Sequence, residues 1–254
     1  MQQTITYTLL ITCVLLLSSC KTHYSKVSYE TENLTVSESL NSLDNEVVQI
    51  YLPYKSILEK DMNRVISVSE TEMEKDKPES LLTNFLADLL IEEGKKEAVR
   101  EGLGFQPEIS FYNYFGILSN IPEGEITVED IFELMPFENE MVFLRLTGEQ
   151  IKVFLDIVAS NGGDSVGGVR FKISEGKAER ILVAGKPLNL NEKYWMVTND
   201  YVANGGSSMQ VFTQRLKMIN TNKKIRNVII KHLEDKQEKG EKLTAKTDGR
   251  ISNE

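Results

Sequence analysis

The stretch that most constrains this chain is residues 197–209, VTNDYVANGGSSM. A strand-like run at residues 194–197 leads into it, and Asn204-Gly205-Gly206 interrupts it. Asn and Gly accept a backbone with positive φ, and glycine lets another molecule approach the main chain closely. Tyr201 places an aromatic ring beside this turn. Two interpretations follow: a loop between two strands, or a small-molecule site with a stacking ring beside a glycine turn.

The charge of the chain limits its partners. There are 29 Lys and Arg against 38 Asp and Glu, a net charge of −9, and none of these residues lies in the first 20 positions. An acidic protein is a poor partner for a nucleic acid polymer or an anionic membrane surface. A small anionic ligand would need a local basic group. The apolar fraction of 41% is ordinary for a soluble globular protein.

The N-terminus resembles a targeting signal. Residues 5–17 form an uncharged apolar run that is too short to span a bilayer and has the length of a signal-peptide core. Leu17-Ser18-Ser19-Cys20 then resembles a bacterial lipobox, although the start, MQQT, lacks Lys or Arg. We predict a signal peptide at 1–19 and lipidation of Cys20; an ordinary signal peptide with an incidental cysteine is the alternative. The expected location is the bacterial cell envelope, with the chain lipid-anchored to the outer membrane.

The remaining chain divides into three parts by composition. Residues 20–43 are polar and predict a tether, and residues 235–254, with ten charged residues in twenty, predict a disordered tail. Between them, 44–234 mixes helical and strand patterns irregularly, which predicts a single α+β domain. Helices are expected at 47–62, from Pro78 onward with proline in the first turn, at 128–134, after Thr147 and at 225–233; strands are expected at 65–68, 109–112, 141–146, 169–173, 180–183 and 194–197.

Local signals support several of these elements. Thr127 with Asp130 and Thr147 with Gln150 are typical of capping boxes at helix starts. Residues 121–127 indicate a turn. In the helix after Pro78, the apolar stripe predicts a buried face, whereas Asn84 and Asp88 on its flank predict a solvated one.

The residues that are scarce restrict the chemistry. Histidine occurs only at His23, in the tether, and at His232, which is in step with Ile225 and Ile229 and is expected at the edge of the core. A hydrolytic transition-metal site normally gathers two or more histidines with carboxylates. Of the two cysteines, Cys13 leaves with the signal peptide and Cys20 carries lipid. No Ser-His-Asp arrangement or phosphate-loop motif is present. The residues alone therefore predict a protein that binds something or supports a partner.

Five short sequence motifs, in this order along the chain, resemble those of a known family. They are Asn113-x-x-Gly116-Ile117, Gly124-Glu125-Ile126-Thr127, Met135-Pro136-Phe137-x-Asn139, Leu146-Thr147-Gly148-x-Gln150 and Asn199-Asp200-Tyr201-x-Ala203-Asn204-Gly205-Gly206. The series resembles the C-terminal domain of 5′-nucleotidases and UDP-sugar hydrolases, over about residues 46–213. The resemblance implies a layered domain of sheets flanked by helices. It also implies a division of labour, in which a separate N-terminal metallophosphoesterase domain holds two metals and the C-terminal domain clamps the nucleoside base between two aromatic rings.

The resemblance implies roles for particular residues. Tyr201 matches one ring of the clamp, and Asn113 and Gly116 match a motif at a strand end beside the ligand. The substrate-binding set that it implies is Asn113, Gly116, Tyr201, Asn204, Gly205, Gly206 and Ser207. Three positions depart from the family: Leu118 stands for an arginine, Ser207 stands for an aspartate, and residues 163–166 contain no aromatic residue for the second ring.

The implied function is the nucleotide-recognition half of a split 5′-nucleotidase in the envelope. Its partners would be a nucleotide or nucleoside and a metallophosphatase subunit, with membrane contact through the lipid anchor and no nucleic acid polymer. No catalytic residue, cofactor or metal is expected in this chain; metals are expected only on the partner, so the chain would not catalyse hydrolysis alone. Two alternatives are a non-catalytic lipoprotein that binds a nucleoside or another small molecule, and a structural module that kept only the fold.

Overall fold

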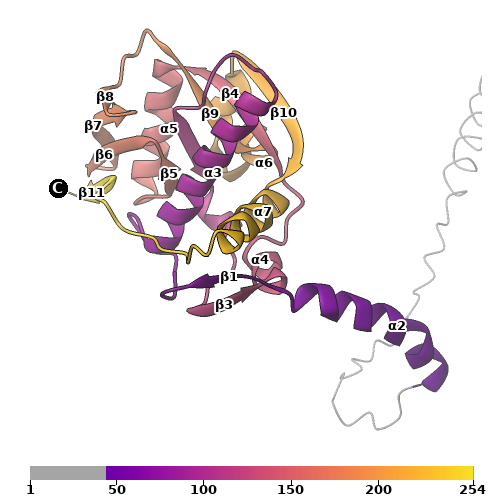
Figure 1. Ribbon diagram of the computed structural model, residues 1–254. Helices are drawn as coiled ribbons and strands as arrows, with labels where there is room; N and C mark the ends of the chain where they lie inside the picture. Colours follow the sequence, from indigo (N-terminus) through magenta and orange to yellow (C-terminus); the bar gives the residue numbers. More distant parts are fainter. Residues whose placement is uncertain (1–43, 254) are drawn as a thin grey trace, which may run out of the picture. The chain divides into compact units, whose positions relative to one another are not determined.

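The computed structural model describes residues 44–253 (Figure 1). The predicted signal peptide at 1–19, the predicted lipidation site Cys20 and the whole predicted tether at 20–43 lie outside the described residues. The chain divides after Gln49 into two units, and the described part of the first, residues 44–49, belongs to the beginning of one helix. Within the described residues, no helix combines the length and the apolar character needed to cross a bilayer.

The fold mixes helices and strands, as predicted. The α-helices are α2 (Asn45–Met62), α3 (Leu81–Arg100), α4 (Val128–Leu134), α5 (Gly148–Ser160), α6 (Asp200–Ala203) and α7 (Ile225–Glu238), with short 3-10 turns η1 (Tyr114–Gly116), η2 (Gly206–Ser208) and η3 (Gln210–Gln214). The strands are β1 (Val65–Ser69), β2 (Ile109–Tyr112), β3 (Gly124–Thr127), β4 (Glu140–Thr147), β5 (Ser165–Gly167), β6 (Val169–Ser174), β7 (Lys177–Val183), β8 (Lys186–Pro187), β9 (Lys193–Asn199), β10 (Lys217–Lys224) and β11 (Ile251–Asn253).

A five-stranded sheet in the order β10-β4-β9-β2-β5 organises the second unit. Its strands alternate their side chains between two hydrophobic cores. Phe143 and Val197 point to a core shared with α3 and α7, whereas Phe111, Leu144 and Met196 point to a core shared with α5 and the four-stranded sheet. The central sheet is therefore buried on both faces, between helices on one side and a helix with a second sheet on the other (Figure 1).

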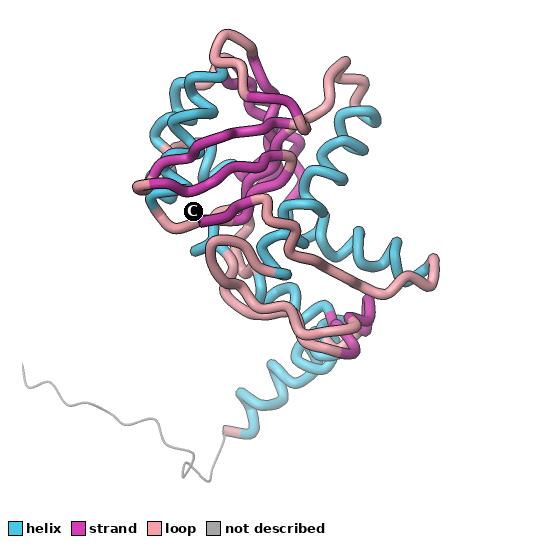
Figure 2. Tube along the Cα trace, turned by 90° about the vertical axis from the view of Figure 1, so that its left-hand side faces the viewer, coloured by secondary structure: helices cyan, strands magenta, loops and turns pink. Residues whose placement is uncertain are grey.

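The four-stranded sheet has the order β11-β6-β7-β8. The strands predicted at 169–173 and 180–183 are present as β6 and β7, which pair antiparallel as a hairpin around Glu175 and Gly176. The edge strand β11 pairs parallel with β6, with Ile251 opposite Phe171 (Figure 2). Ile251 is buried, and so are Leu243 and Arg250. The prediction of a disordered tail at 235–254 is therefore wrong, because these residues finish α7, enter the core and complete a sheet.

Two predictions about α3 are also wrong. Pro78 does not lie in the first turn, because Ser80 is the N-cap and forms a capping box with Thr83. Asn84 is buried rather than solvated, since its amide donates to Glu79 Oε2 at 2.7 Å and to the Lys246 carbonyl at 3.0 Å. Both groups that Asn84 reaches lie outside the helix, so the helical pattern alone does not reveal them.

Other helix and strand boundaries either confirm the predictions from the sequence or differ from them locally. The capping boxes at Thr127 and Thr147 are both confirmed. The segment expected as a turn ends instead in β3, which pairs antiparallel with β1. The connection from β9 to β10 is helical, through α6, η2 and η3, and not an open loop between two strands.

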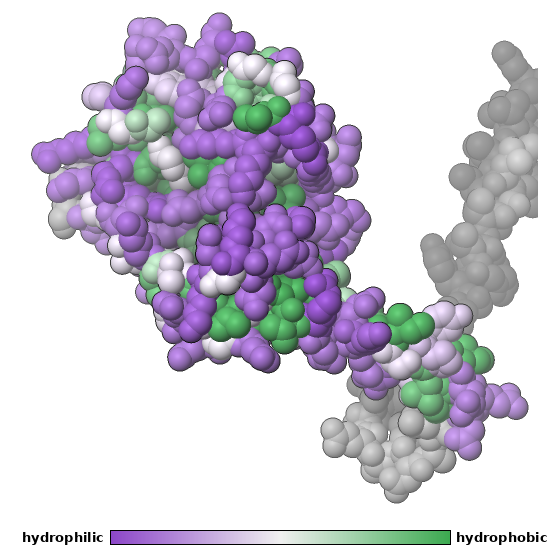
Figure 3. Space-filling view, viewed as in Figure 1, coloured by the Kyte–Doolittle hydropathy of each residue, from purple (hydrophilic) through white to green (hydrophobic). Residues whose placement is uncertain are grey.

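Helix α2 matches its predicted position and has no buried residue. Figure 3 shows apolar side chains along its surface, and Ile50, Ile57 and Leu58 are among those exposed.

Candidate functional site

The predicted site residues gather at one edge of the central sheet. Strands β2 and β9 are parallel neighbours, so their carboxyl ends meet at this edge. Asn113 directly follows β2, and Asn199 ends β9. Strand β5 runs antiparallel to β2 and begins at the same edge, where Ser165 pairs with Tyr112. The sheet therefore brings together segments that are 86 residues apart, since the Asn199 amide donates to Asn113 Oδ1 at 3.1 Å.

Asn199 holds the start of α6 as well as Asn113. Its Oδ1 accepts from the backbone N–H of Val202 at 2.8 Å, which caps the helix. Asp200 Oδ1 accepts from the backbone N–H of Glu140 at 3.0 Å and of Tyr201 at 2.9 Å. These buried and charge-assisted bonds fix the first turn of α6 on the sheet, and Tyr201 lies in that turn.

The ring of Tyr201 packs against the glycine turn. A Cβ on Gly206 would lie 2.5 Å from Tyr201 Cε1, so only glycine leaves room for the ring in this position. Gly205 has φ +96°, in the left-handed region that favours glycine. Tyr201 remains 52% exposed. The turn therefore supports one part of the ring and leaves the rest open to solvent, as a stacking surface requires.

The rest of the turn is also constrained. Asn204 is the C-cap of α6, and its Oδ1 accepts from Arg215 Nη2 at 3.3 Å. Arg215 also donates to the Ala203 carbonyl at 2.7 Å, which ties η3 back onto the turn. Ser207 has φ +52°, unusual for a residue with a side chain. Asn204, Gly205, Gly206 and Ser207 thus form one connected turn beside Tyr201.

Gly116 and Leu118 occupy the segment after β2. Gly116 lies in η1, and a Cβ there would lie 3.0 Å from Asn113 Nδ2, so the glycine lets the turn close over the Asn113 amide. Leu118, where the family has an arginine, is 53% exposed to solvent. No charge therefore comes from this position.

Asp164 is a buried acid at this edge that the sequence interpretation missed. Its Oδ1 accepts from the backbone N–H of Tyr114 at 2.7 Å and of Ser165 at 2.8 Å, which links the turn after β2 to the start of β5. Burial raises the pKa of Asp164 to about 6, against the effects of the two N–H groups and of Lys77. A Gly-Gly-Asp sequence directly before a strand is the signal that points to this residue.

At Gly163, where the segment expected to hold the second aromatic ring begins, no side chain fits. A Cβ on Gly163 would lie 2.1 Å from the Pro78 carbonyl oxygen, and Gly163 has φ +117°. The segment before α3 therefore packs directly on Gly163. This contact excludes an aromatic ring at Gly163, and the next three residues, Asp164, Ser165 and Val166, are buried non-aromatic residues.

One group of side chains has the composition of a metal site. Oxygen or nitrogen atoms of Glu92, Glu93 and His232 lie within 4.8 Å of one another. The Lys96 ammonium lies 2.8 Å from Glu92 and 2.7 Å from Glu93, so it pairs with both carboxylates. His232 is buried and contacts Glu93 Oε1 at 2.7 Å, which confirms its expected place at the core. In the structure the three residues and Lys96 form one cluster of ion pairs and hydrogen bonds.

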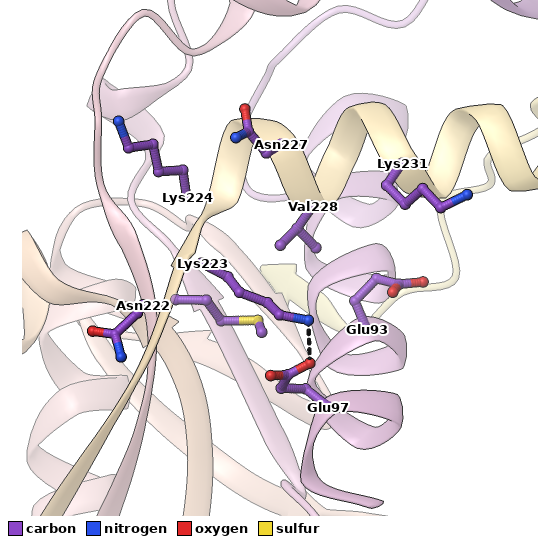
Figure 4. Close-up of a pocket in the computed structure, with 9 residues that line it drawn as sticks. Glu93, Glu97, Asn222, Lys223, Lys224, Asn227, Val228 and Lys231 are labelled. Carbon is purple, nitrogen blue, oxygen red and sulfur yellow. Dashed lines mark hydrogen bonds and ion pairs between the residues drawn. The ribbon is translucent and has the colours of Figure 1, made fainter. Parts of the chain in front are cut away.

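A surface cavity of about 400 Å³ lies between α3, α7 and the end of β10 (Figure 4). Three lysines line it, but each is paired: Lys223 with Glu97 at 2.6 Å, Lys231 with Asp235 at 2.6 Å, and Lys224 with Glu138. None of the predicted site residues lines this cavity. Its charges hold the fold together and do not extend the site at the sheet edge.

The sequence profile described as "5'-nucleotidase, C-terminal domain" matches residues 60–214. The match covers more than half of the chain and includes all seven predicted substrate-binding residues. The chain therefore belongs to the family of 5′-nucleotidase C-terminal domains.

Individual relatives are much longer than this chain. The 5′-nucleotidase of Vibrio vulnificus is 24% identical over 183 residues, covering 70% of this chain and 32% of that protein. The trifunctional nucleotide phosphoesterase of Bacillus subtilis is 30% identical over 152 residues, covering 54% of this chain and 10% of that protein. A 5′-nucleotidase precursor from Thermus thermophilus superposes with a TM-score of 0.66 at 24% identity, covering 83% of this chain and 43% of that one. The chain thus spans about a third of the length of the Vibrio protein.

Proposed function

We propose that this chain is the nucleotide-recognition half of a split 5′-nucleotidase, acting with a separate metallophosphatase chain in the bacterial envelope. One observation carries the proposal. The described domain matches the C-terminal domain of 5′-nucleotidases and accounts for 32% of the length of the Vibrio relative. Within these 254 residues there are only two histidines, so metal-dependent hydrolysis is assigned to the partner.

The sheet edge supports a role in recognition. Tyr201 offers a partly open ring held by Gly206, and the buried Asn113–Asn199 pair fixes that ring relative to the end of β2. Stacking on an aromatic side chain contributes about 1–3 kcal/mol per base in nucleic-acid complexes. The chain would therefore bind the base and orient the nucleotide, and the partner would supply the metals that activate water.

The decisive experiment combines the full chain with a metallophosphatase from the same genome that lacks this domain. Phosphate release from AMP is measured for the metallophosphatase alone, with this chain, and with its Tyr201→Ala variant. A tenfold or larger rise in rate with the wild-type chain, lost in Tyr201→Ala, supports the proposal. Tyr54→Ala on α2 is the matched control for loss of an exposed ring. If the two chains form no complex and the rate does not change, the proposal is wrong.

A second candidate is a lipoprotein that binds a nucleoside or another small molecule without supporting catalysis. The observation that favours it is the pair of altered positions, because Leu118 and Ser207 cannot supply the charged groups of the family. Calorimetry with adenosine separates the two candidates: binding that is lost in Tyr201→Ala, without any effect on a metallophosphatase, favours the second. Absence of adenosine binding in both the wild type and the variant excludes adenosine as its ligand.

A further inference from the structure

Helix α2 carries an apolar stripe that the described residues leave open to solvent. Six large apolar side chains recur along it at the spacing of one helical face, and each is at least 40% exposed: Val47, Ile50, Tyr51, Tyr54, Ile57 and Leu58. Because successive residues of a helix are about 100° apart, the six fall within about 120° of its circumference. Gln49 and Ser56 lie on the opposite face. An exposed stripe of this kind is typical of a helix that packs against another molecule.

The stripe has the repeat of a two-helix coiled coil. Val47 and Tyr54 are one heptad apart, and so are Ile50 and Ile57, which places these four residues at the two core positions of successive heptads. The next core position along the helix is Asp61, so the apolar repeat ends there. A helix with this pattern fits a second helix of the same pattern, and a second copy of the chain supplies one.

Asp61 decides the direction in which two copies of α2 can pair. In a parallel pair Asp61 would face its own equivalent at a core position, and two like charges there repel. In an antiparallel pair the two kinds of core position meet each other, so that Val47 lies opposite Ile57 of the second copy and Ile50 lies opposite Tyr54. Asp61 then extends beyond the start of the other helix and stays in water. The sequence of the stripe therefore favours antiparallel packing.

The charged residues beside the stripe fit the same register. Glu46 and Lys60 occupy equivalent flanking positions two heptads apart, and in an antiparallel pair this position meets its own equivalent. The register that aligns the core therefore brings Glu46 of each copy to Lys60 of the other. Within the described residues, Lys55 and Glu59 form an ion pair at 3.5 Å, whereas Glu46 and Lys60 have no ion-pair partner. A second copy thus supplies both the apolar surface and the opposite charges that complement this face.

We propose that two copies of this chain associate through their α2 helices, which pack antiparallel across a two-fold axis. The helices overlap over about 15 residues, or about 22 Å at 1.5 Å per residue. A contact of this length is small for a protein interface, so the dimer is reversible and its population depends on protein concentration. The inference goes beyond the proposed function and does not depend on it.

The first test measures the mass of the full chain by analytical ultracentrifugation, from about 1 µM to about 300 µM, where small interfaces associate. Cys13 and Cys20 are replaced by serine in every sample. Ile50→Asp places a charge in the contact, and Ser56→Asp is the matched control on the opposite face. The wild type and the control should dimerise as the concentration rises, and Ile50→Asp should weaken dimerisation about tenfold or more. Unfolding temperatures should agree, because both positions are exposed.

Disulfide formation tests the register. Val47→Cys and Ile57→Cys are prepared separately, and each is oxidised alone and in an equimolar mixture. Antiparallel packing brings the two positions together between copies, so the mixture should give a cross-linked dimer and each variant alone should give little. Parallel packing would instead cross-link each variant with itself. A mixture of Gln49→Cys and Ser56→Cys, on the opposite face, is the control and should remain monomeric under denaturing conditions.

Charge reversal tests the flanking pairs. Glu46→Lys and Lys60→Glu should each weaken dimerisation about three- to tenfold, because the two-fold axis makes both pairs like-charged. The double variant Glu46→Lys/Lys60→Glu should regain wild-type dimerisation. Lys55→Glu is the matched control for Lys60→Glu, since it changes the net charge equally but lies away from the contact, and it should leave dimerisation unchanged.

Several results would overturn the inference: a monomer at every concentration, cross-linking of either cysteine variant only with itself, or equal dimerisation of Ile50→Asp and Ser56→Asp. A monomer that binds phosphatidylcholine vesicles or the metallophosphatase, and loses that binding in Ile50→Asp, assigns the stripe to that occupant and also contradicts the dimer. The hydrolysis assay with Tyr201→Ala decides the proposed function separately. Tyr54→Ala should weaken dimerisation and leave the rate in that assay unchanged.

Discussion

The guanidinium group of Arg250 donates two parallel hydrogen bonds to the Asp88 carboxylate, at 2.7 Å from Nη1 to Oδ1 and 2.8 Å from Nη2 to Oδ2. Arg250 is buried, and it also donates to Asp248 and to the Val166 carbonyl. Asp88 lies in α3, and Arg250 lies directly before β11. This bidentate pair therefore ties the C-terminal segment to the helix that also borders the candidate site.

Loss of this pair should destabilise the whole domain. Arg250→Ala leaves polar groups without partners and removes a buried side chain, so we expect a loss of about 2–4 kcal/mol in the free energy of unfolding. Asp88→Ala should cost less because the Asp88 side chain is 55% exposed. Urea unfolding of both single variants and the double variant gives the coupling energy. Wild-type stability in Arg250→Ala would contradict a packed C-terminal segment.

Asp164 makes stability depend on pH in a defined direction. Its folded pKa of about 6 lies above its ordinary value of 3.8, so the fold favours the neutral carboxyl. The contribution of this group is therefore largest below pH 4 and is lost as the pH rises through 6, by on the order of 3 kcal/mol. In Asp164→Asn this dependence should disappear. Unfolding free energies of both proteins from pH 4 to 8 should diverge with rising pH and level off above 7; parallel curves would contradict the burial of this acid.

Gly163 should tolerate no side chain. Gly163→Ala combines a positive φ with a contact of 2.1 Å to the Pro78 carbonyl oxygen, and we expect a loss of about 2 kcal/mol or more. Gly102→Ala is the matched control, because Gly102 also has a positive φ, +61°, but nothing lies within 4 Å of its Cβ position. The difference in thermal unfolding between the two variants isolates the packing contact. Equal effects would mean that backbone strain alone accounts for the loss.

Gly206→Ala should act on binding more than on stability. The φ of Gly206 lies outside the left-handed region, so alanine is compatible with the backbone, but its Cβ would displace the Tyr201 ring. We expect AMP binding to weaken about fivefold or more, with little change in the unfolding temperature. Calorimetry and thermal unfolding of the same sample measure both. Unchanged binding would show that the position of this ring does not matter.

Local signals in the sequence predicted most of the fold. Thr147 and Gln150 mark a helix start within four residues, and both contacts form as expected. The errors involve partners far apart in sequence. The three residues of β11 stand in a charged segment, and only their pairing with Phe171, 80 positions earlier, makes them a strand. Asn84 was expected in solvent for the same reason, since its partner at Lys246 is 162 residues away.

In the candidate site, too, the sequence predicted the residues that are neighbours along the chain and missed those that packing brings together. The turn at 204–206 and its ring could be recognised because Tyr201, Gly205 and Gly206 are neighbours in sequence. Asp164 reaches the sheet edge through the pairing of β5 with β2, and Lys75 and Lys77 precede the residue that packs on Gly163, Pro78. No spacing along the chain relates these residues to Asn113.

The pairing of β11 with β6 also dictates an order of events during synthesis. The N-terminus of the polypeptide emerges first, from the ribosome and again during export, so β6 and β7 emerge about 70 residues before their parallel neighbour. Closing a loop of this length is slow relative to forming a hairpin. The core that the central sheet shares with α5 and the four-stranded sheet consequently stays open at one edge until Ile251 is in place. A nascent chain stalled or clipped before that residue would expose apolar sheet surface, which makes it a target for chaperones and proteases.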